Sequence, residues 1–268
     1  MERERIMSKQ FRWLFLTVWV VAGTAQAADE APAKPLFSLV PGARWTYEET
    51  QKSEQVAGSN TNTTRITGTV DEEVLRAPPE YSTNGNVVLY RSAGTEQRES
   101  NGSVSPVSGG FVQLLEWRQG DLYLRGIRVW MEGSYSEDMN LYKPPLLYLK
   151  ATAHVGDSWT VGTQRIMGIR MPTMATLDAI ENVTVPAGTF TNCLKVTYVT
   201  WRMSGVTDQA AMKLLVEDGS VRDTVWFAKD VGIVKEAQVK STMYSTGQGS
   251  TMSHDEQTKL LKSYTPVK

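Results

Sequence analysis

Residues 185–196 read Val-Pro-Ala-Gly-Thr-Phe-Thr-Asn-Cys-Leu-Lys-Val, a proline-glycine turn followed by an alternating run. A proline presets φ at the first central position of a turn, and a glycine soon after it tolerates positive φ. In the residues that follow, Leu194 and Val196 share one face of an extended chain and the residues between them point to the other face. The stretch therefore predicts a β-hairpin that joins Thr176–Val185 to Thr189–Trp201.

Similar turn signals and short alternating runs continue along the whole chain. Pro-Gly, Asn-Gly, Gly-Gly and Asp-Gly pairs separate runs rich in Val, Ile, Thr, Tyr and Trp, which is typical of an all-β protein. No segment keeps a period of 3.6 residues, and the best helix candidate is the short segment Thr207–Val216, with Thr207 or Asp208 as its N-cap. Further strands are expected at Arg44–Gln51, Thr63–Leu75, Val87–Ser92, Phe111–Arg118, Leu122–Met131, Ser158–Gly168, Ala175–Val185, Val221–Ala228, Gly232–Tyr244 and Gln257–Tyr264.

The amino-terminal residues have the features of a secretory signal peptide. Several basic residues precede the apolar run Trp13–Gly23, which is 11 residues long. A helix that spans a bilayer needs about 20 residues, so this run is too short for a membrane anchor. The small-x-small pattern Ala25-Gln26-Ala27 predicts cleavage before Ala28. No cysteine follows for acylation, so we expect a protein without a transmembrane anchor, in the periplasm or secreted.

The rest of the chain is predicted to form one domain. After a signal peptide at 1–27, residues 28–34 are a polar linker, and residues 35–268 form a single β domain. A Gly-x-x-Trp-Thr motif occurs twice, which leaves open two related half-sheets at 36–131 and 146–264. Two unrelated strands that each begin with a core tryptophan are the simpler interpretation.

Composition excludes several classes of protein. Cys193 is the only cysteine, so no intrachain disulfide can form and stability must come from an apolar core. We expect the Cys193 thiol to be buried and inert. Without residues 1–27, 24 Lys and Arg remain against 27 Asp and Glu, a formal charge of −3. This balance argues against nucleic acid as a partner and against binding to a strongly anionic membrane surface.

Three motifs together resemble a group of bacterial exported proteins and lipoproteins of unknown function. They are Gly42-x-x-Trp45-Thr46-Tyr47, the turn and strand at 185–196, and the segment Trp226–Lys235. The resemblance implies a mainly β fold with little helix, in the form of a strongly curved antiparallel sheet or partly open barrel. It also implies an analogy of architecture to the half-barrels of LolA-type carriers of lipid-modified proteins. The group has no established catalytic residues to carry over.

A curved sheet must fill its concave face with its own side chains or with a ligand. Six tryptophans follow the signal peptide, and most fall on expected strands, where core packing explains them. Trp130, Met131, Trp201 and Met203 are the residues that we expect to line an apolar groove on the concave side. Core packing of these residues is the alternative.

No set of residues has the spacing of a catalytic or metal site. The chain holds 2 histidines, His154 and His254, both in polar stretches, and no Gly-x-Ser-x-Gly motif. Its many methionines suit flexible core packing better than Cu(I) binding, because ligand-like spacing does not repeat. The acidic groups at residues 71–73 and 217–218 are interpreted as solvated strand ends. We therefore expect no catalytic residue, no metal and no cofactor.

These observations favour a non-enzymatic envelope protein that binds an apolar ligand, a lipid or an acylated partner in the concave face. A structural or assembly factor that acts through protein–protein contacts, by strand addition at a sheet edge, is the second hypothesis. A hydrolase with a dispersed site is the least favoured.

Overall fold

The computed structural model of the chain describes residues 35–82, 87–131, 134–135, 139–166, 169–201, 205–209, 212–246 and 249–267. The predicted signal peptide and linker lie outside these residues. The described part consists of strands and the turns between them. It contains no helix long and apolar enough to cross a membrane.

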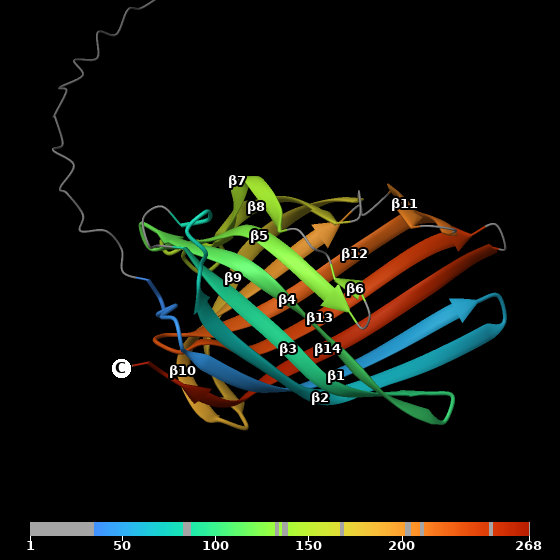
Figure 1. Ribbon diagram of the computed structural model, residues 1–268, viewed down its shortest axis with the longest axis horizontal. Coiled ribbons are helices and arrows are strands. Elements are labelled where there is room, and N and C mark those ends of the chain that lie inside the picture. Colours follow the sequence, from blue (N-terminus) through green and yellow to red (C-terminus); the bar gives the residue numbers. More distant parts are fainter. Residues whose placement is uncertain are drawn as a thin grey trace, which may run out of the picture. The chain divides into compact units, whose positions relative to one another are not determined.

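All described strands belong to one antiparallel sheet (Figure 1). Twelve of them follow the order β6-β5-β4-β3-β2-β1-β14-β13-β12-β10-β9-β8, while β7 pairs with β5 and β11 pairs with β12. The strands are β1 (Arg44–Ala57), β2 (Asn60–Arg76), β3 (Val87–Ser100), β4 (Ser103–Arg118), β5 (Asp121–Met131), β6 (Ser134–Tyr135), β7 (Asn140–Leu149), β8 (Ser158–Ile166), β9 (Ile169–Val185), β10 (Gly188–Trp201), β11 (Gly205–Gln209), β12 (Met212–Ala228), β13 (Gly232–Thr246) and β14 (Gly249–Thr265).

The sheet curls into a nearly closed barrel with one unsealed seam, which confirms the expected fold class. The first and last strands, β1 and β14, pair along their full length, so the seam lies elsewhere, between β7 and β8. No backbone ladder joins these two strands in the described residues. Strand β7 contains Pro144 and Pro145, which lack the N–H donors that a ladder needs. Side chains bridge the seam instead: the Trp159 indole donates to the Leu147 carbonyl at 3.1 Å.

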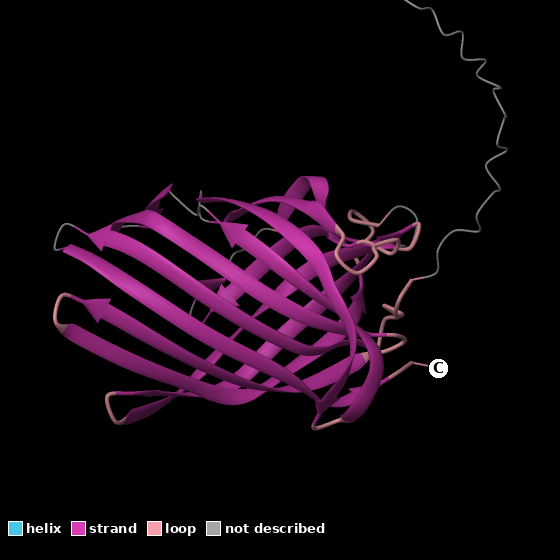
Figure 2. Ribbon diagram, turned by 180° about the vertical axis from the view of Figure 1, so that it is seen from behind, coloured by secondary structure: helices cyan, strands magenta, loops and turns pink. Residues whose placement is uncertain are grey.

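The two ends of the barrel differ. We call the end with the turns at 119–120, 186–187 and 229–231 the base, and the end with the hairpin tips at 58–59 and 101–102 the rim (Figures 1 and 2). Residues that precede β1 lie across the base, where the ring of Phe37 makes an edge contact with Trp117 at 5.2 Å and stacks on Phe227 at 6.2 Å. The base is therefore closed by the chain itself.

The apolar core lies in the base half of the barrel. Tyr47, Phe227 and Leu261 have no exposed surface, and Trp45 is held by a hydrogen bond from its indole to the Val231 carbonyl at 2.8 Å. Cys193 is fully buried in the same core, as predicted, and burial raises the pKa of its thiol. Packing of this core replaces the disulfides that a single-cysteine chain lacks.

The hairpin predicted from residues 185–196 is confirmed. Strands β9 and β10 pair around a turn at 186–187, and Gly188 has a φ of 127°, in the region that favours glycine. The helix predicted at Thr207–Val216 is wrong. Its described parts belong to β11 and β12, which pair with each other from Gly205↔Val216 to Gln209↔Met212. Pairing with a long neighbouring strand overrides the weak local helix signal of a ten-residue segment.

Candidate functional site

The inner wall of the barrel changes in character from the base towards the rim. On β1 the inward-facing residues Trp45 and Tyr47 are 3% and 0% exposed. The next inward-facing residues, Glu49, Gln51 and Ser53, are polar and partly exposed. Because residues on one face of a strand share one environment, this change shows that solvent reaches the lumen above Tyr47.

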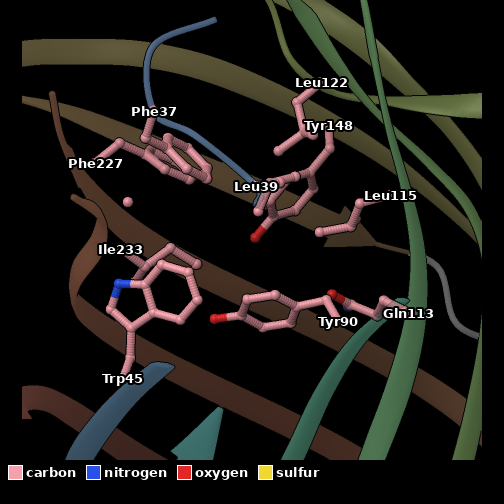
Figure 3. A pocket seen from close by; sticks show the side chains of 11 residues that line it. Phe37, Leu39, Trp45, Tyr90, Gln113, Leu115, Leu122, Tyr148, Phe227 and Ile233 are labelled. Atoms are coloured by element: carbon pink, nitrogen blue, oxygen red, sulfur yellow. The ribbon is translucent and has the colours of Figure 1, made fainter. Parts of the chain in front are cut away.

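A small cavity lies at the floor of this lumen, and we call it the floor cavity (Figure 3). Its volume is about 30 Å³, which is enough for one or two water molecules and too small for an acyl chain. Most of its wall is aromatic or aliphatic, and Tyr90, Tyr148 and Gln113 supply polar atoms. Figure 3 shows the hydroxyl groups of Tyr90 and Tyr148 pointing into the space between the apolar side chains.

Four ionisable residues from different strands converge in the lower lumen: Glu72 on β2, Asp223 on β12, Glu236 on β13 and Lys259 on β14. We call them the charge cluster. The Lys259 ammonium contacts Glu72 Oε1 at 2.9 Å and Glu236 Oε2 at 2.8 Å. Burial alone would lower the pKa of Lys259, but the carboxylates of Glu236 and Glu72 outweigh it and raise this pKa well above its usual range. Lys259 therefore stays charged inside the barrel.

Aromatic residues complete the surroundings of Lys259 and Glu72. The Lys259 ammonium lies 4.8 Å from the centre of the Tyr47 ring, within the range of a cation–π interaction. The Tyr90 hydroxyl donates a hydrogen bond to Glu72. Both carboxylate oxygens of Glu72 thus have buried hydrogen-bond partners, so Glu72 needs no contact with solvent.

Asp223 differs from the other carboxyl groups of the charge cluster. It faces the lumen between Tyr198 on β10 and Gln238 on β13, the residues with which it is paired across the ladders. Its Oδ1 atom is buried and has no hydrogen-bond partner. Burial and the negative charge of Glu236 raise the pKa of Asp223 well above its usual range, and Lys259 only partly opposes them. Among the described residues, the Oδ1 atom of Asp223 therefore has neither a hydrogen-bond donor nor a cation in contact.

A second acidic pair lies beside the charge cluster, because Glu49 on β1 is the ladder partner of Lys259 on β14. Burial, followed by the nearby Glu96, raises the pKa of Glu49 from 4.5 to about 7. The side chain of Gln257 donates to Glu49 Oε1 at 2.7 Å. The lumen wall therefore carries more acidic than basic groups from the floor upwards.

The structure describes only part of the predicted apolar groove. Trp201 lies at the end of β10 and is 39% exposed. The side chains of Trp130, Met131 and Met203 lie outside the described residues. The groove therefore stays a prediction. Trp130, Met131 and Trp201 do fall where β5 and β10 end towards the rim.

Sequence reasoning missed the charge cluster and misinterpreted one of its members. Glu72 was expected at a solvated strand end, but it is 1% exposed. A signal was present, because Glu72 alternates with Val70 and Val74 on the inward face of β2. Its partner Lys259 is 187 residues away, and nothing in the sequence alone brings the two together.

Other reactive residues do not form a catalytic arrangement. The His154 side chain is 89% exposed beside Asp157, and His254 lies within 3.1 Å of the Ser241 hydroxyl. Cys193 is buried without a histidine partner among the described residues. In the same part of the chain, no three His, Cys, Asp or Glu residues are placed to hold a metal ion.

Comparisons with known proteins find no matching family model and no matching curated protein. Two solved structures are similar to the chain over most of its length. One is a "putative lipoprotein" from Parabacteroides distasonis, with 17% identity and a TM-score of 0.38, covering 86% of this chain and 98% of that one. The other is a "putative exported protein with YmcC-like fold" from Bacteroides fragilis, with 15% identity and a TM-score of 0.33, covering 82% of this chain and 95% of that one.

Proposed function

We propose that this chain is an exported binding protein that holds a ligand in the lumen of its barrel without catalysing a reaction. The observation that carries the proposal is the change along the inner wall. Core side chains fill the base, whereas the inward-facing Glu49, Gln51 and Ser53 keep partial exposure. A barrel whose lumen is closed at one end and reached by solvent above it has the form of a ligand-binding site.

Export is part of the proposal and rests on the amino-terminal sequence. Basic residues, the apolar run Trp13–Gly23 and the small residues before Ala28 together match a cleaved secretory signal. The formal charge of −3 after residue 27 suits a protein that acts away from nucleic acid.

The apolar ligand expected from the sequence fits only the upper part of the lumen. The floor cavity, of about 30 Å³, is too small for an acyl chain, and the wall above it is acidic. A lipid or acylated partner would therefore contact the rim side, towards which the strands that carry Trp130, Met131 and Trp201 of the predicted groove end, although Trp201 itself pairs with Ser220 on the outer face. We propose that the apolar part of a ligand lies there and that a polar part reaches the lower lumen.

A matched pair of variants tests whether the lumen is the site. Gln51→Trp places a large ring inside the lumen, and Thr50→Trp places the same ring on the exposed outer face of the same strand. Native mass spectrometry of protein purified from the cell envelope is expected to show a bound mass on the wild type and on Thr50→Trp, and none on Gln51→Trp. Equal loading of both variants, or a wild type that binds nothing, would refute the proposal.

The unsealed seam favours one second candidate, an assembly factor that acts through protein–protein contacts. Strand β8 pairs with β9 on one side only, and its other edge faces β7 without a ladder in the described residues. An edge of this kind accepts an added strand from a partner. Co-purification of an envelope protein in place of a small molecule would favour this candidate.

A further inference from the structure

We infer that the lower lumen binds a primary ammonium group, with Asp223 and Glu236 as its carboxyl partners. This inference rests on the proposed function, because it names the chemical class of the ligand for the same lumen. It starts from the unequal distribution of partners within the charge cluster.

Lys259 already forms ion pairs with two of the three carboxyl groups of the charge cluster. Its ammonium contacts Glu72 at 2.9 Å and Glu236 at 2.8 Å, and it is 7% exposed. Asp223 makes no such contact, and its buried Oδ1 accepts no hydrogen bond. A buried acceptor without a donor destabilises the protein, and more so when the group is charged. Asp223 lies on the inward face of β12, so its unpaired Oδ1 is an acceptor that an incoming donor can satisfy.

Charge points to the same class of ligand. Three carboxyl groups share one ammonium in the charge cluster, and the acidic pair Glu49 and Glu96 lies beside it, with Glu49 paired to Lys259 across the β1–β14 ladder. Lys240 on β13 and Arg98 on β3 also lie on the inward faces, but the inward carboxyl groups of the described strands outnumber these cations and Lys259, so a cation that enters from the rim meets a net negative wall. A negatively charged ligand would be repelled by the same residues.

Hydrogen bonding and size indicate which class of cation fits the site, namely an ammonium group that carries N–H donors. The unpaired Oδ1 of Asp223 needs a donor, which a quaternary ammonium lacks. A metal ion is disfavoured, because the described residues place no three His, Cys, Asp or Glu ligands together. Tyr148, which lies near Asp223, also lines the floor cavity, whose volume of about 30 Å³ is enough for one ammonium head.

Aromatic rings border the inferred site. Tyr198 is the ladder partner of Asp223, and its ring stacks on that of Tyr148 with 4.9 Å between centroids. Asp223 lies close enough to Tyr148 to contribute to the raised pKa of this phenol, after burial as the main cause. Tyrosine faces beside carboxyl groups are a recurring setting for organic cations.

The raised pKa of Asp223 gives the inference a thermodynamic signature. Burial and Glu236 favour the protonated carboxyl in the free protein. An ammonium ion beside Asp223 would favour the ionised form, so its binding should release a proton. We expect the affinity to increase with pH, as long as the amine itself stays protonated.

Isothermal titration calorimetry with butane-1,4-diamine tests the inference. The wild type is expected to bind the diamine, and Asp223→Asn to bind it roughly tenfold to a hundredfold more weakly, as for the loss of one hydrogen bond to a charged group. Asp255→Asn is the matched control, because it removes the same charge from the inward face of β14 nearer the rim. The affinity of Asp255→Asn for the diamine should stay within about twofold of the wild-type affinity. Tetramethylammonium should not bind.

Two outcomes would overturn the inference: no binding of the diamine, or equal binding by the wild type and Asp223→Asn. If Asp223→Asn does not fold, titrations of the wild type in buffers of different ionisation enthalpy decide, and a lack of proton release overturns the inference. If native mass spectrometry shows a bound mass but the protein has no affinity for the diamine, the proposed binding of a ligand in the lumen is kept. Only the inference of an ammonium group is then rejected.

Discussion

The base and the lower lumen use the same alternating strands for opposite purposes. At the base, inward-facing residues such as Tyr47, Phe227 and Leu261 are fully buried and apolar or satisfied by hydrogen bonds. A short distance above, the inward positions carry Glu72, Lys259 and other charged groups. Apolar burial stabilises a fold, whereas buried charges are at best neutral for stability compared with apolar residues of equal size. The base therefore maintains the fold, and the lumen is where we propose that a ligand binds.

Removal of an aromatic side chain from the base should have the largest effect. Phe227 is fully buried, stacks on Phe37 and makes an edge contact with Tyr148. Phe227→Ala should lower the free energy of unfolding by about 3–5 kcal/mol, measured by urea denaturation. A loss below about 1 kcal/mol would show that the base does not hold the barrel together.

A break in the charge cluster should have the next largest effect. Lys259→Met leaves Glu72 buried without a counter-ion, so we expect a loss of about 3 kcal/mol at pH 7. The control is Lys262→Met, which removes an exposed ion pair with Glu48 and should change stability by less than about 1 kcal/mol. Equal effects of the two variants in urea denaturation would contradict the burial of this cluster.

Much of the fold follows from the sequence, but the site does not. The hairpin at 185–196 is predictable because its turn and its alternation are local. The helix prediction for Thr207–Val216 is wrong because the segment pairs as strands, and a local sequence pattern does not show which strand a segment pairs with. Glu72 and Lys259 meet only after β1, which pairs with both β2 and β14, brings their strands together. Convergence of distant strands is therefore the part that sequence reasoning could not supply.

Neutralisation of Glu49 should have a moderate, pH-dependent effect on the free energy of unfolding. Burial and then Glu96 raise the pKa of Glu49 from 4.5 to about 7, so the folded protein holds this proton more tightly than the unfolded chain. The contribution of Glu49 to wild-type stability should therefore fall as the pH rises from 4.5 to about 7. Glu49→Gln cannot ionise and should be more stable than the wild type at pH 8 by on the order of 2 kcal/mol.

The same comparison at pH 4 should show almost no difference, because Glu49 is then protonated in both states. Thermal unfolding across the pH range measures the effect, with the exposed Glu48→Gln on the same strand as the control. A Glu49→Gln curve parallel to that of the wild type would show that this carboxyl group is solvated as an ordinary surface residue is.

Changes on the outer face near the rim should have the smallest effect. Met252 is 56% exposed and is paired with Met243 across β13 and β14. Met252→Ser should change the free energy of unfolding by no more than about 0.5 kcal/mol. A larger loss would mean that the outer surface near the rim is covered in the folded protein.

Thiol labelling compares the two regions most directly. Cys193 is buried and should stay unreactive in the folded protein, so new cysteines report on their own positions. Gln51→Cys faces the lumen above Tyr47, and Val234→Cys replaces a fully buried inward-facing residue near the base. A small maleimide is expected to label Gln51→Cys rapidly and to leave Val234→Cys unlabelled until the protein unfolds. Equally slow labelling of both would show a closed interior and would contradict a lumen that receives a ligand.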